Sequence, residues 1–267
     1  MELDGKVAVV TGGTRGVGAG IARAFVRAGA EVVICARRPP EVRLPGTEFM
    51  PLDVRDADGV GRLFAGLPRV DVLVNNAGGA PHRLLTEAGA DRHKRVVELN
   101  LLAPLTVSLA AYDGLRRSKG SIVMIGSVSG GRPSPGTAAY GAAKAGLESL
   151  ARSMAVEWAP DVRVNTLVVG MVRTERSHLH YGDRDGVAAV GRTVPLGRLA
   201  EPSEVGAAAV FLASGAAAYI SGASLLVHGG GERPAFLDAA TGGRTSAEDA
   251  EDAADAEDKE SSHEEPT

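Results

Sequence analysis

The sequence predicts an α/β fold, a doubly wound sheet of seven parallel strands with helices packed on both of its faces. Short, nearly continuous apolar runs alternate with longer helical patterns, as in sheets that are covered on both sides. A glycine-rich turn follows the first apolar run. The chain has 267 residues, of which 44% are hydrophobic and 23% charged, and this suits one large domain.

The predicted strands are short apolar segments separated by turns or helical patterns. They are residues 6–11, 31–36, 49–54, 70–75, 121–127, 162–169 and 224–228. Helices are expected after the glycine turn to residue 28, and at 92–117, 140–159 and 203–213. The link at 37–48 contains Pro39, Pro40 and Pro45, so an irregular or one-turn connection is expected there.

The charge divides the chain into two parts. Residues 238–267 carry 11 acidic and 2 basic side chains and no aromatic ring, whereas residues 1–237 carry 22 acidic and 27 basic ones. A segment of this composition buries too little apolar surface to offset its ordering entropy. We therefore expect a single Rossmann-type domain over 1–237 and an acidic, disordered tail over 238–267.

Composition also limits the setting in which the protein works. The single cysteine, Cys35, excludes an intrachain disulfide, and the N-terminus lacks a signal-peptide pattern. No run of 18 or more apolar residues indicates a membrane span. The basic excess is small and unclustered, which argues against nucleic acid as a partner. A cytoplasmic protein with no membrane partner is expected.

The turn at residues 11–18 carries the first functional signal. Gly12, Gly16 and Gly18 lie between an apolar strand and a helix. Glycines in that setting let the backbone approach a pyrophosphate, which the N–H groups of the helix start then bind. The sequence thus predicts a Rossmann-type dinucleotide site.

The end of the second strand indicates which dinucleotide is bound. NAD enzymes place a carboxylate there to bind the ribose 2′-hydroxyl, but this chain has Cys35, Ala36, Arg37 and Arg38. Arg15 and Arg37 are suited to clamp a 2′-phosphate. We therefore predict that NADP(H) is preferred and NAD(H) is less favoured.

A Tyr-x-x-x-Lys pattern, Tyr140 and Lys144, begins the helix predicted at 140–159. Residues at i and i+4 share a helix face, so the ammonium is expected beside the phenol. A neighbouring cation lowers a tyrosine pKa and suits the phenol for proton exchange with a substrate oxygen.

With Ser127 ending the fifth strand and Asn100 after the Asn-Asn-Ala-Gly motif at 75–78, residues 3–230 resemble the short-chain dehydrogenase/reductase family. The resemblance implies that Tyr140 is the acid/base, Lys144 its partner and a ribose ligand, and Ser127 the donor to the substrate oxygen. It also implies that Asn100 holds a water of the proton relay. The cofactor-binding residues it implies are Gly12, Thr14, Arg15, Gly16, Val17, Gly18, Arg37, Arg38, Asp53, Val54, Asn76, Ala77, Gly78, Tyr140, Lys144, Gly170, Val172 and Thr174.

Two positions depart from the family pattern. Val169 stands where a proline usually precedes Gly170, and His228 stands where an aspartate usually precedes two glycines. Residues 171–198 correspond to the segment that covers the substrate, and its polar stretch at 177–186 is expected to be mobile. His178, His180 and Asp183 lack a metal-ligand spacing, so no metal is expected.

Several functions stay open at this point. The main prediction is an oxidoreductase that moves a hydride between NADP(H) and a carbonyl or secondary alcohol. A 3-oxoacyl thioester reductase of the same family is one alternative. A catalytically silent nucleotide-sensing protein is another, although such proteins usually lose the Tyr or Lys, and a scaffold acting through the acidic tail is a third. By resemblance, a homotetramer is expected, with a dimer second.

Overall fold

A computed structural model describes residues 2–236 of the chain, and the predicted acidic tail at 238–267 lies outside this range. The strands are β1 (Val7–Thr11), β2 (Glu31–Ala36), β3 (Thr47–Pro51), β4 (Val72–Asn75), β5 (Ser121–Ser127), β6 (Arg163–Val169) and β7 (Ser224–Val227). They form one sheet in the order β3-β2-β1-β4-β5-β6-β7, and every neighbouring pair is parallel. The predicted doubly wound, seven-stranded sheet is confirmed.

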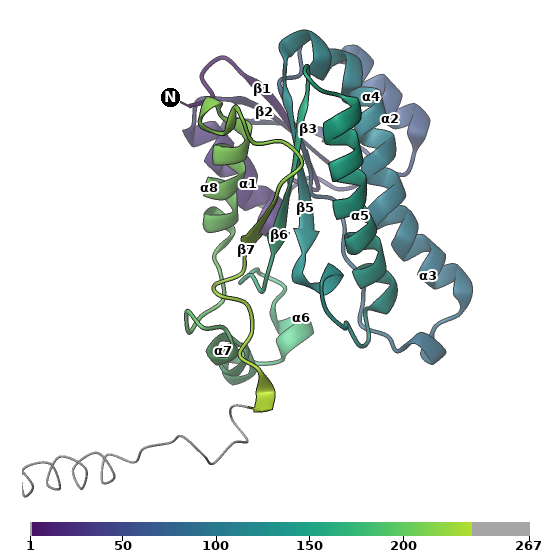
Figure 1. The fold of residues 1–267 in the computed structure, drawn as a ribbon, viewed down its shortest axis with the longest axis vertical. Helices are drawn as coiled ribbons and strands as arrows, with labels where there is room; N and C mark the ends of the chain where they lie inside the picture. The colour runs from purple at the N-terminus through teal and green to yellow at the C-terminus, as the bar shows by residue number, and fades with distance from the viewer. Residues whose placement is uncertain (1, 237–267) are drawn as a thin grey trace, which may run out of the picture. The chain divides into compact units, whose positions relative to one another are not determined.

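Two layers of helices cover the sheet (Figure 1). The helices around the sheet are α1 (Gly16–Arg27), α2 (Ala57–Gly66), α3 (Ala90–Val97), α4 (Ala103–Ser118), α5 (Ala138–Glu157) and α8 (Pro202–Ala213). Helices α1 and α8 pack together on one face, and α2, α4 and α5 cover the other. Each layer buries its own apolar core, with Phe25 and Leu212 in the first and Leu115 and Leu147 in the second.

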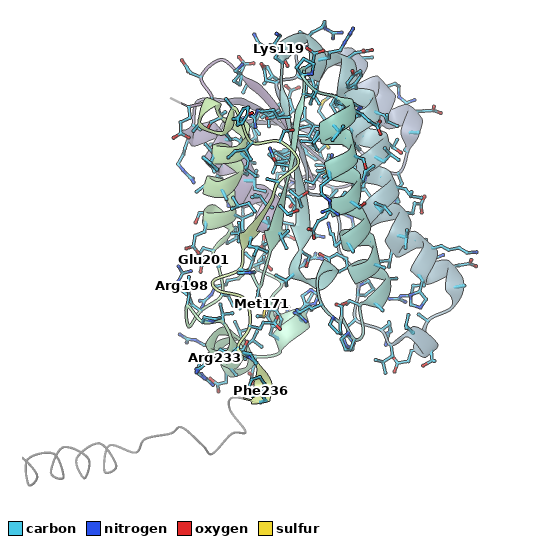
Figure 2. All side chains as sticks on the ribbon, viewed as in Figure 1. Lys119, Met171, Arg198, Glu201, Arg233 and Phe236 are labelled. Atoms are coloured by element: carbon cyan, nitrogen blue, oxygen red, sulfur yellow. The ribbon has the colours of Figure 1, made fainter. Side chains whose placement is uncertain are left out.

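The sheet order fixes where a ligand can bind. From β1 the chain winds outward to β3 and then returns to continue at β4 on the other side of β1. Loops at the carboxyl ends of β1 and β4 therefore diverge to opposite sides and leave a crevice between them. Met171, Glu201 and Arg198 lie at this end of the molecule, and Lys119 lies at the opposite end (Figure 2).

Most predicted elements appear with small shifts in their bounds. The segment between β2 and β3 contains no helix, as the prolines predicted. The prediction of the third strand at 49–54 is shifted toward the C-terminus, because β3 pairs with β2 only as far as Pro51. Leu52 and Val54 are buried although they lie beyond the strand, and their apolar character extended the predicted segment. The polar stretch at 177–186 includes α6 (His178–Tyr181) and the start of α7 (Arg184–Thr193), helices that the turn-rich composition did not indicate.

The long helix expected at 92–117 is interrupted. A π-helical segment, η2 (Glu98–Leu102), joins α3 to α4, and the Ala103 N–H bonds the Glu98 carbonyl. The whole stretch Ala90–Ser118 is long and apolar enough to cross a membrane by length and composition alone. Core helices of globular proteins pass the same test, and here α4 packs Val107, Ala111 and Leu115 against the sheet.

Candidate active site

The glycine loop connects β1 to α1 at the crevice. Gly12 and Gly16 have positive φ angles of 64° and 52°, a conformation that glycine adopts without strain. A side chain at Gly18 would overlap the Gly12 carbonyl and the Asn76 amide. Arg15 precedes α1 and provides no side-chain cap, so the helix start presents backbone N–H groups toward the crevice. This loop fits the pyrophosphate of a dinucleotide.

Asn76 fixes the loop from the neighbouring strand. Its amide nitrogen lies 2.9 Å from the Thr11 carbonyl oxygen and 3.1 Å from that of Gly12. The Thr11 hydroxyl accepts from the backbone N–H groups of Asn76 and Ala77. Asn76, one of the predicted cofactor-binding residues, therefore uses its side chain to hold the glycine loop in place.

Positive charge gathers where an adenosine would lie. The Gly12 N–H donates to the Cys35 carbonyl at 2.7 Å, which brings the end of β2 against the glycine loop. Arg37 and Arg38 follow directly and are exposed, as is Arg15. None of these three side chains forms an ion pair with another described residue. They remain available to an anionic ligand.

Asp53, one of the predicted cofactor-binding residues, is held by Arg55. The guanidinium contacts both carboxylate oxygens, at 3.0 and 2.6 Å. The hydrogen bond from Arg55 keeps the pKa of Asp53 below its usual value, and the charge of Arg37 adds to this effect. Val54 is buried beside it. Arg55 was not among the predicted site residues, although an arginine two positions after a functional carboxylate was a detectable signal.

Ser127, Tyr140 and Lys144 converge at the carboxyl end of β5. Ser127 is the last residue of β5, and its side chain hydrogen-bonds that of Tyr140 in the first turn of α5. One turn further along, the Lys144 ammonium lies 5.5 Å from the centre of the Tyr140 ring. The helical spacing thus brings the phenol and the ammonium together as predicted.

The pKa values differ from the expectation. Burial raises the pKa of Tyr140, and the hydrogen bond with Ser127 offsets only part of this effect. Burial lowers the pKa of Lys144 from 10.5 to about 8, and its ammonium donates to the Ile125 carbonyl at 2.7 Å. The predicted lowering of the Tyr140 pKa by Lys144 is therefore wrong for the protein alone, because the ammonium is directed at a backbone carbonyl.

Asn100 lies in the π-helical segment and is fully buried. Its amide nitrogen donates to the carbonyls of Gly79 and Val96, and its amide oxygen accepts from the Gly79 N–H. The widened turn is the kind of irregularity that functional sites often contain. Both amide N–H groups of Asn100 are used on backbone carbonyls, which leaves only the second lone pair of its amide oxygen for a water of the proton relay.

The Asn-Asn-Ala-Gly motif links the glycine loop to the lysine. A side chain built on Gly78 would begin 2.6 Å from the Asn100 amide oxygen and 3.5 Å from the Lys144 nitrogen. Two residues earlier, Asn76 holds the Gly12 carbonyl. The predicted dinucleotide loop and the Tyr-Lys pair therefore border one crevice.

Residues after β6 close the crevice. Val172 forms a parallel bridge with Ala200, which closes the base of the 171–198 segment. Thr174 lies beside Gly16, next to the glycine loop. A side chain at Gly170 would start 2.8 Å from the His228 Cβ. Val169 directly precedes Gly170, so the two residues that depart from the family pattern, Val169 and His228, lie near each other.

One further contact of the 171–198 segment was not predicted from the sequence. Glu175 accepts a hydrogen bond from the Gly16 N–H at 3.0 Å. The two residues are 159 positions apart, so no local pattern links them. Thr14 and Val17 belong to the same loop and helix start.

The chain is similar over most of its length to known dehydrogenases and reductases. A family model described as enoyl-(acyl carrier protein) reductase matches residues 12–232. The chain is 40% identical to L-fucose dehydrogenase of Oryctolagus cuniculus, over 85% of each protein. It is 35% identical to the 3-oxoacyl-[acyl-carrier-protein] reductase FabG of Vibrio cholerae, over 86% of this chain and 98% of that protein. A solved short chain dehydrogenase/reductase family protein matches with a TM-score of 0.78 and 37% identity, over 86% and 99% of the two chains.

Proposed function

This chain belongs to the short-chain dehydrogenase/reductase family of oxidoreductases, and from that premise we propose that it moves a hydride between NADP(H) and a carbonyl or secondary alcohol, with Tyr140 as acid/base. The observation that carries the proposal is the shared crevice. Residues 76–78 contact the glycine loop on one side and approach the Lys144 ammonium on the other.

The chain's own residues handle the proton and the orientation of the substrate. When bound, the cofactor supplies the hydride. Ser127 and Tyr140 present two hydroxyl groups to the substrate oxygen. Because burial raises the pKa of Tyr140, the phenol is protonated at neutral pH, and this form donates a proton to a carbonyl that is being reduced. Lys144 contacts the Tyr140 ring and would bind the nicotinamide ribose.

The NADP(H) preference rests on the arginines around the end of β2. Arg15 and Arg37 are exposed and flank the contact between Gly12 and Cys35, and no carboxylate ends β2. Guanidinium groups in this position suit a 2′-phosphate. Arg55 already pairs with Asp53, so it is less available to that phosphate than Arg37.

We expect turnover with NADPH to exceed that with NADH by at least about tenfold in kcat/KM, because a charge-assisted contact contributes about 1.5–3 kcal/mol. The measurement is NADPH or NADH absorbance with a panel of reducing sugars, 3-oxoacyl thioesters and simple ketones, plus the corresponding alcohols with NADP⁺ and NAD⁺. Turnover of no compound with either cofactor would contradict the function, and a clear NADH preference would contradict only the cofactor proposal.

The Arg37→Ala variant sharpens the same test. It should lose the preference for NADPH while its rate with NADH stays nearly unchanged. Arg27→Ala is the matched control, since Arg27 is an exposed arginine on the outer side of α1. It should keep both rates.

Sugars are the substrate class to test first. Relatives named L-fucose dehydrogenase are 37–40% identical to this chain. The rim beside Tyr140 includes Arg83, His93 and Thr137, which suit hydroxyl groups. A 3-oxoacyl thioester is the second candidate, supported by the FabG relative and the acyl carrier protein in the family description. The silent nucleotide-sensing alternative is disfavoured because Ser127, Tyr140 and Lys144 are all present and assembled.

A homotetramer, with a dimer second, is part of the same proposal. Exposed apolar side chains lie on α4 and α5 (Leu109, Val156) and on β7 and α8 (Leu226, Phe211). Two separate apolar surfaces suit two kinds of subunit contact. Light scattering of the full chain should give about four times the 27.3 kDa mass of one chain, and a monomer would contradict the proposal.

A cytoplasmic location is also proposed, supported by the single cysteine and its burial.

A further inference from the structure

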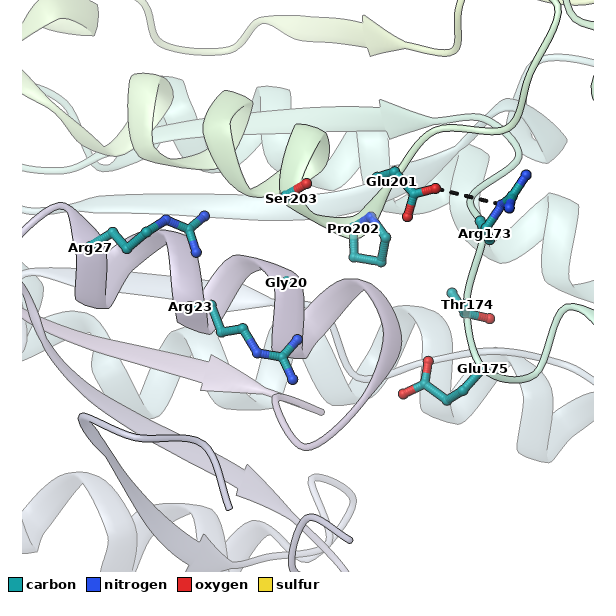
Figure 3. A pocket seen from close by; sticks show the side chains of 9 residues that line it. All are labelled: Gly20, Arg23, Arg27, Arg173, Thr174, Glu175, Glu201, Pro202 and Ser203. Atoms are coloured by element: carbon teal, nitrogen blue, oxygen red, sulfur yellow. Dashed lines mark ion pairs between the residues drawn. The ribbon is translucent and has the colours of Figure 1, made fainter. Parts of the chain in front are cut away.

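Glu175 occupies the start of α1. The segment 171–198 leaves the sheet after β6 and returns at Ala200, and just inside its base the chain turns toward the glycine loop. The Glu175 carboxylate accepts from the Gly16 N–H at 3.0 Å, and Thr174 approaches the same glycine. Figure 3 shows this carboxylate extending from the loop back toward α1, from which Arg23 projects.

The surroundings of this carboxylate are those of an anion site. Burial raises the pKa of Glu175, but the Gly16 hydrogen bond and the charges of Arg15 and Arg23 outweigh it, so the net pKa is below its usual value. The side chain is therefore ionised at neutral pH. A cavity of about 520 Å³, lined by Arg23, Arg173 and Glu175, adjoins it (Figure 3).

We propose that Glu175 occupies the phosphate seat of the glycine loop in the cofactor-free protein and must leave it when the pyrophosphate of the dinucleotide binds. This inference rests on the proposed function. It makes Glu175 an internal competitor of the cofactor, held on the segment that covers the substrate.

The competition follows from charge and from the number of donors. The Gly16 N–H is one donor and serves one strong acceptor at a time. The phosphate oxygens and the carboxylate are both negatively charged. They would repel each other if they stayed at the helix start together. After Glu175 leaves, the Gly16 N–H at the helix start is free to bind the pyrophosphate.

The contact also couples two parts of the site. While Glu175 bonds Gly16, the 171–198 segment is tied to the glycine loop, and departure of the carboxylate releases that tie. Because coupling between two sites is reciprocal, cofactor binding and release of the 171–198 segment should favour each other to the same extent.

The test compares Glu175→Ala and Glu175→Gln with the wild type. Calorimetry should show tighter binding of NADPH and of inorganic pyrophosphate, by about fivefold for the alanine variant and about threefold for the glutamine variant. Affinity for adenosine, which has no phosphate, should not change. Hydrogen-exchange mass spectrometry of the ligand-free protein should show faster exchange at Gly16 in the alanine variant.

Glu201→Gln is the matched control. Glu201 lines the same cavity and is also acidic, but it pairs with Arg173 and makes no contact with the glycine loop. An equal affinity gain in this control would reduce the effect to bulk charge and overturn the inference, as would unchanged pyrophosphate affinity or unchanged Gly16 exchange. If pyrophosphate binding depends on Glu175 and NADPH does not bind at all, the proposed function fails and the competition for the phosphate seat stands.

Discussion

Replacing Tyr140 by phenylalanine should lower kcat by about a hundred- to ten-thousandfold, the range that a positioned general acid or base contributes. The substitution removes one hydroxyl group, and the ring stays packed beneath the Lys144 ammonium. The Ser127 hydroxyl still accepts a hydrogen bond from the Ser129 N–H, but the substrate oxygen loses its proton donor. The phenol is expected to contact the substrate and not the phosphates of the cofactor. The Kd of NADPH should therefore change by less than about twofold.

The control for this variant is Tyr112→Phe. Tyr112 packs on Trp158 with ring centres 4.8 Å apart, in the core on the α4 and α5 side of the sheet. Its loss of a hydroxyl group should leave kcat nearly unchanged. Steady-state kinetics with the best substrate of the panel, together with NADPH titration, separates the two effects. Tyr140→Phe with wild-type turnover would remove the acid/base from the mechanism.

Replacing Lys144 by methionine should abolish turnover and stabilise the cofactor-free fold at neutral pH. Burial holds the pKa of Lys144 at about 8, against 10.5 for the unperturbed group. This difference corresponds to about 3 kcal/mol of unfavourable free energy for the charged side chain in the folded state. Loss of the bond to the Ile125 carbonyl offsets about 1 kcal/mol of the gain, so a net increase of about 1–2 kcal/mol in unfolding free energy is expected.

The pH dependence of stability gives the sign of this effect. Below pH 8 both the folded and the unfolded wild type carry the lysine proton, so the full penalty is present. Between pH 8 and 10.5 the folded state releases its proton first, so the stability of the wild type rises with pH. The advantage of Lys144→Met should therefore shrink across this window.

Urea unfolding at pH 7 and pH 10 measures the difference. Lys119→Met is the control, because Lys119 is exposed at the end of the molecule away from the crevice (Figure 2). It should show no gain at either pH. A Lys144→Met protein that is less stable than the wild type at both pH values would mean that the packing and the carbonyl contact of Lys144 outweigh the burial of its charge.

The fold class, the strands and the position of the glycine loop could all be predicted from the order of the residues. Periodicity alone located β2 and β5 with their observed bounds, because strands covered on both faces are continuously apolar. The positive φ at Gly12 and the crowding at Gly18 are local backbone requirements, which residue identity records directly. The i, i+4 spacing likewise placed Tyr140 and Lys144 on one face.

The protonation and the hydrogen bonds of these side chains depend on the packed fold and could not be predicted from the sequence. The Lys144 ammonium is directed at Ile125, a strand residue brought beneath α5 by packing, and burial sets both pKa values in the pair. The bond between Glu175 and Gly16 joins segments that are remote in sequence. Desolvation and long-range contacts depend on the positions of all neighbouring elements, whereas periodicity and spacing record only what one element requires of its own residues.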